Sequence, residues 1–276
     1  MSSPSLNIRL LSPTDLGFAQ EIRQRAGWNQ TDKDWKRLLA HEPEGCFLAE
    51  WEGKPAGTAT TTTHDGTVGW IGMVLVHPDS RRKGIATALL ERCIEYLRPR
   101  TRCIKLDATP DGREVYRRLE FEEESTFQRW HRGRDGTPSP RPAEDSPPDL
   151  AHVLSSDVNA FGCDRSAYLL KLARDSRVFL GPTGFALLRP GENAHYLGPS
   201  VALDDREGES LVRKALELIG EEPVFWDIPD ENRSAIALAR TLGFAPQRIL
   251  YRMRLGEHGF EGNLRLQWAI GAPETG

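Results

Sequence analysis

The sequence predicts an α/β fold repeated in tandem, each copy a central mixed β-sheet flanked by helices. The strongest indication is a nearly continuous apolar run over residues 70–76, which is typical of a buried strand. Apolar residues at helical spacing follow over 85–97 and predict an amphipathic helix. The same order of strand and helix patterns returns in the second half of the chain, after a proline-rich segment.

Composition is that of an ordinary globular protein. The chain has 276 residues, 38% hydrophobic and 28% charged, which suits one large or two ordinary domains. Its net charge of −4 does not suggest a nucleic-acid partner. No apolar run approaches the roughly 20 residues of a membrane helix, and the first residues lack a basic-then-apolar signal pattern. We therefore expect a cytoplasmic protein with neither a nucleic-acid nor a membrane partner.

The cysteines show no CxxC spacing, so we expect no metal site. Cys46, Cys93, Cys103 and Cys163 are isolated from one another in the sequence and predict buried, reduced thiols. A disulfide between Cys93 and Cys103 is the less favoured alternative.

The first quarter of the chain contains one break with polar and aromatic side chains. Trp28, Asn29 and Gln30 interrupt a helical pattern, although a tryptophan is often simply part of the core. His64 falls in a turn, where we expect an exposed side chain rather than a base. The expected elements are a strand over 8–11, helices over 15–25 and 33–41, and a hairpin of strands over 46–51 and 56–63.

Three cations and a glycine stand between the central strand and its helix. Arg81, Arg82 and Lys83 bring positive charge to a helix start, where backbone N–H groups are free and the helix dipole is positive. Gly84 has no side chain to keep a ligand away from the backbone. This combination predicts a phosphate or pyrophosphate site. The alternative is a solvated basic turn that only caps the helix.

The same residues resemble the acyl-CoA-binding motif of the GNAT acyltransferase superfamily. That motif is Arg/Gln-x-x-Gly-x-Gly/Ala, and Arg81, Gly84 and Ala86 fill it. The resemblance implies that the 82–87 loop cradles the pyrophosphate of acetyl-CoA and that the 74–76 backbone pairs with the pantetheine arm. The cofactor contacts expected from it are Val74, Leu75, Val76, Arg81, Arg82, Lys83, Gly84, Ile85, Ala86, Thr87 and Thr109.

The segment from Pro110 to Phe121 resembles a second GNAT pattern, Leu-Tyr-x-x-x-Gly-Phe, with Tyr116 at its tyrosine. Two residues depart from the family. Thr109 stands where many members have asparagine, and Glu120 stands at the glycine. A non-glycine residue in a left-handed helix cap costs on the order of 1–2 kcal/mol. The expected elements are a strand over 102–108, a helix over 113–119 and a strand over 125–131.

The resemblance implies direct transfer of an acetyl group from acetyl-CoA to an amine. Tyr116 is the candidate proton donor to the leaving thiolate, with packing on the sheet as its alternative role. Asp107, near the end of its strand, is the candidate base for the acceptor ammonium, directly or through water. Its alternative role is to cap the turn at 110–112. A backbone N–H over 74–76 is expected to stabilise the thioester oxygen.

The second half repeats the order of elements but lacks the chemistry. Its strand-to-helix turn is acidic over 204–207, and Ala239 aligns with Tyr116. The chain thus resembles bacterial tandem-GNAT acetyltransferases with one active half. The predicted domains are a catalytic domain over 1–132, a proline-rich linker over 133–149 and a degenerate GNAT-like domain over 150–276.

The second half is expected to shape the acceptor pocket or to hold a dimer together. In the GNAT fold the break at Trp28, Asn29 and Gln30 resembles a lid over the acceptor, and the second half carries Asp164 and Arg165 at the corresponding break. Asp164 would pair with an acceptor ammonium and Arg165 would bind a carboxylate. An Asp–Arg pair within the domain, or a helix cap, is the alternative. The expected elements are a broken helix over 155–175, a hairpin over 178–188, strands over 195–203, 223–229 and 249–255, and helices over 207–219 and 232–242.

Three functions remain open from the sequence. We favour an N-acetyltransferase that acts on a small-molecule amine, because the second half and the lid-like break suit a closed pocket. A protein or peptide acetyltransferase and a non-catalytic acyl-CoA sensor are the alternatives. A homodimer is compatible with this interpretation.

Overall fold

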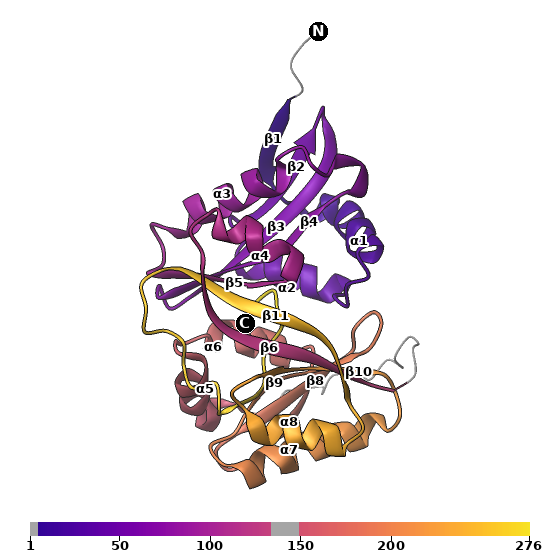
Figure 1. Cartoon of the computed structure of the whole chain (residues 1–276), viewed down its shortest axis with the longest axis vertical. Coiled ribbons are helices and arrows are strands. Elements are labelled where there is room, and N and C mark those ends of the chain that lie inside the picture. The colour runs from indigo at the N-terminus through magenta and orange to yellow at the C-terminus, as the bar shows by residue number, and fades with distance from the viewer. Residues whose placement is uncertain (1–4, 134–148) are drawn as a thin grey trace.

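The structure of the protein is a computed structural model that describes residues 5–133 and 149–276. The predicted linker therefore lies outside the described residues, apart from its two ends, Gly133 and Asp149. Across the described residues the strands form one continuous sheet that passes through both halves of the molecule. Figure 1 shows the N-terminal half above and the C-terminal half below, joined by two long crossing strands.

The first half contains the predicted strands and helices with small changes at their ends. The short helix before the last strand begins at Pro110 rather than at Arg113, because Thr109 caps it. The elements are β1 (Leu6–Leu10), α1 (Leu16–Arg25), α2 (Asp32–His41), β2 (Cys46–Trp51), β3 (Lys54–His64), β4 (Val68–Val76), α3 (Ile85–Leu97), β5 (Cys103–Ala108), α4 (Pro110–Arg117) and β6 (Glu122–Arg132).

The second half repeats this order and adds one short strand that we did not predict, β12 (Gln267–Ala269). Short 3-10 turns precede α1, α3 and α5. The other elements are α5 (Leu154–Phe161), α6 (Ser166–Ala173), β7 (Arg177–Leu180), β8 (Phe185–Arg189), β9 (His195–Val201), α7 (Asp205–Ile219), β10 (Val224–Pro229), α8 (Arg233–Thr241) and β11 (Ala245–Gly256).

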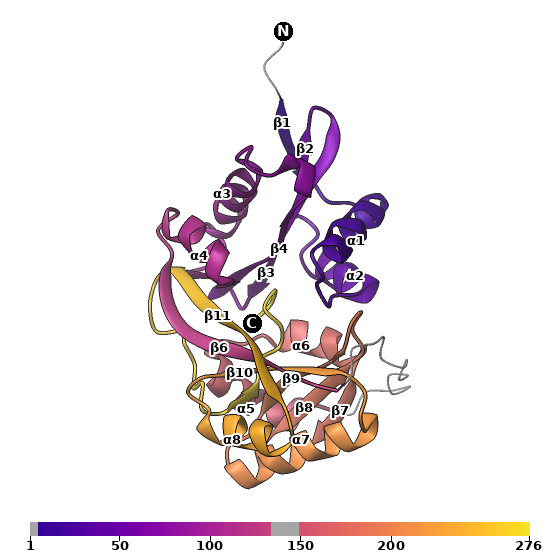
Figure 2. The same ribbon diagram turned by 45° about the vertical axis from the view of Figure 1, so that its right-hand side comes forward.

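The two halves exchange their last long strands. The strand order is β1-β2-β3-β4-β5-β11-β6-β10-β9-β8-β7, so β11 of the second half pairs with β5 of the first. In return β6 of the first half pairs with β10 of the second. The antiparallel pair of β6 and β11 lies at the centre of the sheet, as Figures 1 and 2 show. Each half is therefore completed by a strand from the other half.

The helices cover both faces of the sheet, and the core continues between the halves. In Figure 2, α3 and α4 lie on one side of β3 and β4, while α1 and α2 lie on the other. One buried cluster joins Trp35 and Leu38 of α2 to Tyr168 and Leu169 of α6. Burial of apolar surface across this boundary makes the second half part of the support for the first.

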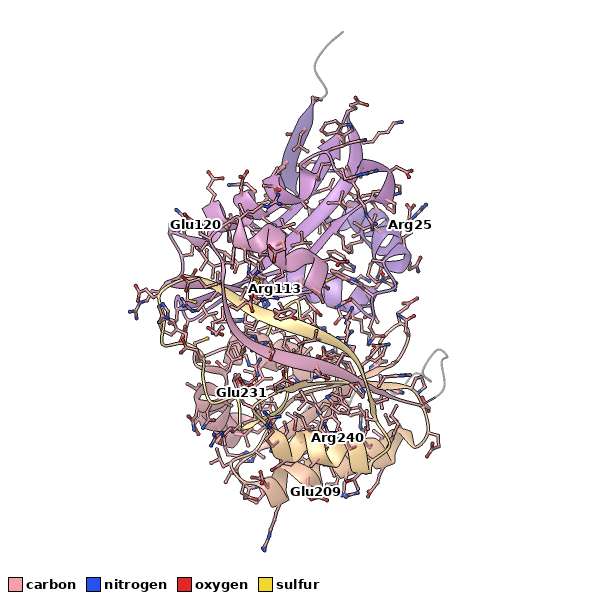
Figure 3. The ribbon with its side chains drawn as sticks, viewed as in Figure 1. Arg25, Arg113, Glu120, Glu209, Glu231 and Arg240 are labelled. Carbon is pink, nitrogen blue, oxygen red and sulfur yellow. The ribbon has the colours of Figure 1, made fainter. Side chains whose placement is uncertain are left out.

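The helix ends before the exchanged strands confirm the alignment of the two repeats. Glu120 has a φ of 66°, and Phe121 N donates to Tyr116 O in a Schellman arrangement. In the second half Gly243 has a φ of 79°, and Phe244 N donates to Ala239 O. Glu120 therefore adopts the left-handed conformation expected of a glycine, at the exposed edge of the first half in Figure 3.

Other expectations from the sequence can also be compared with the structure. His64 was expected to be exposed, but it is only 2% exposed, because β3 continues to this residue and Phe161 and Tyr168 pack on its ring. All four cysteines are buried free thiols, so Cys93 and Cys103 are not bridged. Over residues 5–133 and 149–276, none of the helices is long and apolar enough to cross a bilayer.

Candidate active site

The site begins where two neighbouring parallel strands separate. β4 and β5 pair only from Val68 to Trp70 on one strand and from Cys103 to Lys105 on the other. Beyond Trp70 the β4 ladder to β3 contains an irregularity at Met73, whose φ is 50°. Thr58 Oγ1 holds this irregularity by donating to Met73 O at 3.0 Å. The separation leaves one edge of β4 without a ladder partner from β5 and opens the fold between the strands.

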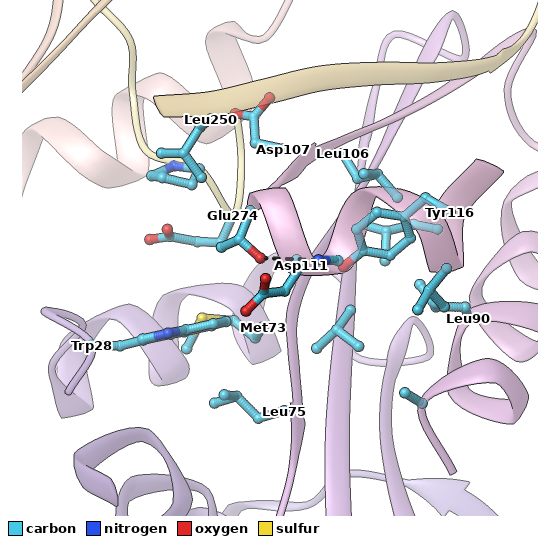
Figure 4. Close-up of a pocket in the computed structure, with 18 of the residues that line it drawn as sticks. Trp28, Met73, Leu75, Leu90, Leu106, Asp107, Asp111, Tyr116, Leu250 and Glu274 are labelled. Carbon is cyan, nitrogen blue, oxygen red and sulfur yellow. Dashed lines mark hydrogen bonds between the residues drawn. The ribbon is translucent and has the colours of Figure 1, made fainter. Parts of the chain in front are cut away.

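A cavity of about 460 Å³ occupies this opening (Figure 4). In the close-up, Tyr116 and Trp28 lie on opposite sides of the pocket, with Glu274 nearer to Trp28. Of the residues predicted for a site, those that line the cavity are Trp28, Asn29, Gln30, Val74, Leu75, Val76, Arg81, Ala86, Asp107, Thr109 and Tyr116. The sequence therefore predicted residues that the first half contributes to both sides of the cavity, among them Trp28 and Tyr116.

The basic turn lies at one end of the cavity and is open to solvent. Arg81 lines the cavity, while Arg82, Lys83, Gly84, Ile85 and Thr87 do not. Gly84 is the N-cap of α3 with a φ of 78°, and a Cβ added there would meet no atom within 4 Å. Ile85 is instead buried in the core, and Lys83 Nζ lies 5.2 Å from the Trp51 ring centroid. The open space over Gly84 beside three exposed cations suits an anionic group.

Tyr116 lies on α4 and presents its ring to the cavity. The ring packs edge-on against Phe121, with centroids 6.2 Å apart. Burial raises the pKa of the Tyr116 hydroxyl to about 12, so it remains protonated at neutral pH. Thr109 Oγ1 accepts a hydrogen bond from Gly112 N at 3.2 Å, which fixes the start of the same helix. Tyr116 thus presents a protonated hydroxyl group at the cavity, and its role as proton donor stays a prediction.

Asp107 lines the cavity but is committed to a partner from the other half. Arg252 on β11 donates to both carboxylate oxygens, at 3.0 and 3.1 Å, and the Asp107 side chain is 0% exposed. Burial raises the pKa of Asp107 to about 6 despite these bonds. The proposed alternative role, a cap on the 110–112 turn, is wrong because Thr109 makes that cap. Asp107 therefore holds β5 to β11, and its role as a base stays a prediction.

The three residues at the helical break are used in different ways. Asn29 is buried and bonds to the loop before β9, accepting from Asn193 N and Ala194 N at 2.8 and 3.0 Å. Gln30 Nε2 donates to Glu274 Oε2 at 2.7 Å, while its own Oε1 is buried without a hydrogen-bond partner in the described chain. The half-buried Trp28 and Gln30 therefore remain available to a ligand, whereas Asn29 anchors the second half.

Asp164 and Arg165 are not brought to the cavity. Arg165 is buried and donates to both oxygens of Asp157, at 3.0 and 2.9 Å. Asp164 Oδ1 accepts from Ser166 N, the first residue of α6, at 2.8 Å. Arg165 thus forms an Asp–Arg pair within its own half, which was one of the alternatives. Both placements correct the expectation that Asp164 and Arg165 face the acceptor.

Sequence reasoning missed the wall of the cavity that the exchanged strands and the C-terminal segment build. These residues are Arg129 on β6, Arg248 and Leu250 on β11, and Pro273 and Glu274 after β12. Trp70 Nε1 donates to Pro273 O at 3.1 Å, which ties this segment to β4. One signal was available, because Arg248, Arg252 and Arg254 place three cations in a strand of the core.

The corresponding opening in the second half is filled by the chain itself. β9 and β10 pair over His195–Leu197 and Val224–Trp226, and β12 then pairs with β9 beyond that point. A Cβ on Gly208 would lie 1.9 Å from the Trp268 ring, so this ring fills the space beside α7. The acidic turn is also engaged, because Glu207 Oε1 accepts from Thr183 N and Gly184 N at 2.8 and 3.0 Å.

Comparisons with known proteins agree with this geometry. The sequence model of the acetyltransferase (GNAT) family matches residues 14–121, and an acetyltransferase (GNAT) domain model matches residues 153–267. An uncharacterized N-acetyltransferase of Methanocaldococcus jannaschii is 30% identical over 126 residues, 42% of this chain and 55% of that protein. The chain thus spans little more than half of that relative. An acetyltransferase of Yersinia enterocolitica is 34% identical over 107 residues, 36% of this chain and 73% of the relative.

The similarity also extends across both halves. The solved structure of a Pyrococcus horikoshii protein, provisionally named an acetyltransferase, superposes with a TM-score of 0.83 at 25% identity. That match covers 98% of this chain and 96% of the other. The chain therefore belongs to the GNAT acetyltransferase family and contains two such domains in tandem.

Proposed function

We propose that the first half is an N-acetyltransferase that transfers the acetyl group of acetyl-CoA directly to a primary amine of a small molecule. The observation that carries this proposal is the cavity between β4 and β5, which runs from the basic turn at Arg81 to the hydroxyl-bearing ring of Tyr116. The second half has its equivalent opening filled by β12 and Trp268 and carries alanine at the position of Tyr116. We assign one active half per chain.

The residues of the first half fit acetyl-CoA. Arg81, Arg82 and the open α3 terminus at Gly84 would hold the pyrophosphate, because cations and free N–H groups stabilise an anion there. The unpaired edge of β4 over 74–76 would bond to the amides of the pantetheine arm, as an added strand does. When bound, acetyl-CoA supplies the acetyl group as a thioester.

Two side chains on opposite sides of the cavity would move the protons. We assign the base to Glu274, because the carboxylate of Asp107 is already bound by Arg252. Glu274 would take a proton from the acceptor ammonium, and the freed amine would then form the new N–C bond as the C–S bond breaks. The acylated nitrogen would release its remaining extra proton to solvent and so become the neutral amide. Tyr116 would donate its hydroxyl proton to the leaving sulfur and regain one from solvent. A backbone N–H of β4 over 74–76 would stabilise the charge on the carbonyl oxygen.

The enclosing second half favours a small molecule over a peptide. Arg129, Arg248 and Glu274 line the cavity together with residues of the first half such as Gln30, so strands and loops of both halves enclose the acceptor end. The buried free thiols agree with a location in the cytoplasm.

The proposal can be tested by measuring the release of CoA thiol from acetyl-CoA in the presence of pooled small amines or pooled peptides. We expect release with the amines, and we expect Tyr116→Phe to abolish most of it. Release with peptides only would favour a protein acetyltransferase. Tight acetyl-CoA binding with no transfer to either pool would identify a sensor and refute the proposal.

A further inference from the structure

We propose that the acceptor amine also carries a carboxylate, that Arg248 binds this carboxylate, and that Glu274 faces the ammonium group. This inference rests on the proposed function and names the substrate class for the same cavity. The inference is based on three charged residues that line the acceptor end: Arg129 on β6, Arg248 on β11 and Glu274 in the C-terminal segment. None of them belongs to the acyl-CoA motif.

Among residues 5–133 and 149–276, Arg248 is a cation without an ion-pair partner. It lies directly across the β6–β11 ladder from Arg129, and like charges in such cross-strand pairs repel. Arg129 is neutralised by Asp227, whose two carboxylate oxygens accept at 2.7 and 2.6 Å, and Tyr196 Oη donates to the same carboxylate at 2.9 Å. Asp227 is therefore already bound by Arg129 and Tyr196, and among the described residues Arg248 forms no ion pair. Its Nε is buried with no hydrogen-bond partner in that part of the chain.

Arg129, Asp227 and Arg248 together carry one net positive charge, and both arginines line the cavity. Burial and the neighbouring Arg129 lower the pKa of Arg248 to about 10, so the guanidinium stays charged at neutral pH. Arg248 is half-buried, so its guanidinium is partly removed from water without a counter-ion among the described residues, and a bound anion would offset that desolvation cost. A guanidinium donates to a carboxylate through two parallel N–H groups, which makes a carboxylate the matching anion.

Glu274 supplies a negative charge in the same cavity. Its carboxyl group lines the same cavity, and the residue is 7% exposed. The hydrogen bond from Gln30 at 2.7 Å holds one of its oxygens, and the free Gln30 Oε1 adds a further acceptor for an N–H group. No ion pair joins Glu274 to Arg248 in the described structure. The two charges are therefore left to a ligand that carries both an ammonium and a carboxylate.

The remaining contacts favour an apolar body on this ligand. Leu250 follows Arg248 on the same face of β11, and Trp28 and Met73 line the cavity nearby. A polyamine would place a second cation against Arg248, and a peptide N-terminus would present an amide there instead of a carboxylate. An amino acid with an apolar side chain satisfies all three features of the pocket.

The inference is tested with acceptors in matched pairs that differ only by the carboxylate. Suitable pairs are leucine with isopentylamine, methionine with 3-(methylthio)propylamine, and 4-aminobutyrate with propylamine. CoA release should give a kcat/KM for the acids higher by roughly 10-fold to 100-fold, the typical effect of a charge-assisted hydrogen bond. Leucinamide should behave like the amine.

Substitution of Arg248 links the preference to this residue. Arg248→Met should remove the preference by raising the KM of the acids far more than that of the amines, so that the ratio of the two kcat/KM values falls toward one. Arg248→Lys should retain part of the acid preference, because the positive charge remains but the two parallel N–H donors of the guanidinium are lost. Arg254→Met is the matched control, since it removes a guanidinium of the same strand that lies outside the cavity and pairs with the exposed Glu122 at 2.6 Å.

The outcomes separate this inference from the proposed function. Equal kcat/KM values for the acids and the amines in the active wild-type enzyme would overturn the inference and leave the proposed function standing. An acid preference that persists in both Arg248 variants would also overturn it. If acetyl-CoA binds and no amine of either kind is acetylated, the proposed function itself fails. Thermal unfolding adds a readout without turnover, because N-acetyl-leucine should raise the Tm of the wild type but not that of Arg248→Met.

Discussion

Arg252 on β11 and Asp107 on β5 form a buried, two-pronged ion pair across the boundary between the halves. Their side chains are 4% and 0% exposed, and the guanidinium also lies 4.7 Å from the centroid of the Trp70 ring. The pair therefore sits at the point where β4 and β5 separate, and it fixes the exchanged strand beside the cavity. A chain that ended near residue 133 would lack β11, so β5 would lose its antiparallel neighbour and Asp107 would lose Arg252.

The first prediction concerns Asp107→Asn. Breaking a buried ion pair by removing one partner leaves an uncompensated charge, so we expect the free energy of unfolding to fall by about 3–5 kcal/mol. Urea denaturation followed by circular dichroism measures this change. Asp79→Asn is a control, because that side chain is 88% exposed. A variant with unchanged stability but much lower kcat would instead make Asp107 the catalytic base.

The second prediction concerns the left-handed cap at Glu120. Because its φ is 66°, replacement by glycine relieves backbone strain, and Glu120→Gly should raise the free energy of unfolding by about 1 kcal/mol. Gly243→Ala in the second half should lower it by a similar amount, since a Cβ there meets no atom within 4 Å and only the φ of 79° opposes it. Chemical denaturation of both variants measures the two changes. If Glu120→Gly were neutral or destabilising, contacts of the Glu120 side chain would outweigh the strain.

Local sequence patterns were sufficient for most of the fold. Strand and helix periods are properties of neighbouring residues, so the order of elements around Gly84 and Tyr116 could be predicted directly. The exchange of β6 and β11 could not, because it is a choice between long-range strand partners, which local periodicity does not determine. The Glu274 side of the pocket was missed for the same reason. Glu274 belongs to a segment without periodicity, and long-range contacts such as the bond from Trp70 to Pro273 O bring it to the site.

The third prediction concerns the cofactor turn. Gly84→Val should weaken acetyl-CoA binding strongly, because the new side chain enters open space over the α3 terminus where the ligand approaches. Gly53→Val is a matched control, since Gly53 has a φ of 76° and equally open surroundings but lies in the β2–β3 hairpin. Both variants carry similar backbone strain, so only the first should lose affinity in a calorimetric titration.

The same titration of the wild type should give one acetyl-CoA per chain, because β12 fills the second opening. Two equivalent sites would contradict the assignment of the second half, and unaltered affinity in Gly84→Val would contradict that of the loop.

The fourth prediction concerns Tyr116→Phe. The variant should keep its affinity for acetyl-CoA and lose roughly 100-fold to 10,000-fold in kcat, the usual effect of removing a positioned proton donor. Tyr251→Phe on β11 is the matched control, because that ring is stacked beneath Arg113 and lies outside the cavity. Steady-state kinetics with a responsive amine measures both variants. Unchanged turnover in Tyr116→Phe would mean that water protonates the thiolate.

The last prediction is the pH dependence of the reaction. Burial raises the pKa of Glu274 above its ordinary value of 4.5, and the base must be ionised to accept the ammonium proton. We therefore expect kcat/KM to fall as the pH is lowered through a pKa above 4.5. Tyr116, with a pKa of about 12, stays protonated through neutral and moderately alkaline pH, so it should cause no loss of activity there. Glu274→Gln should reduce kcat and remove the acidic limb of the profile. An unchanged acidic limb in this variant would return the role of base to Asp107, whose pKa is also raised, to about 6.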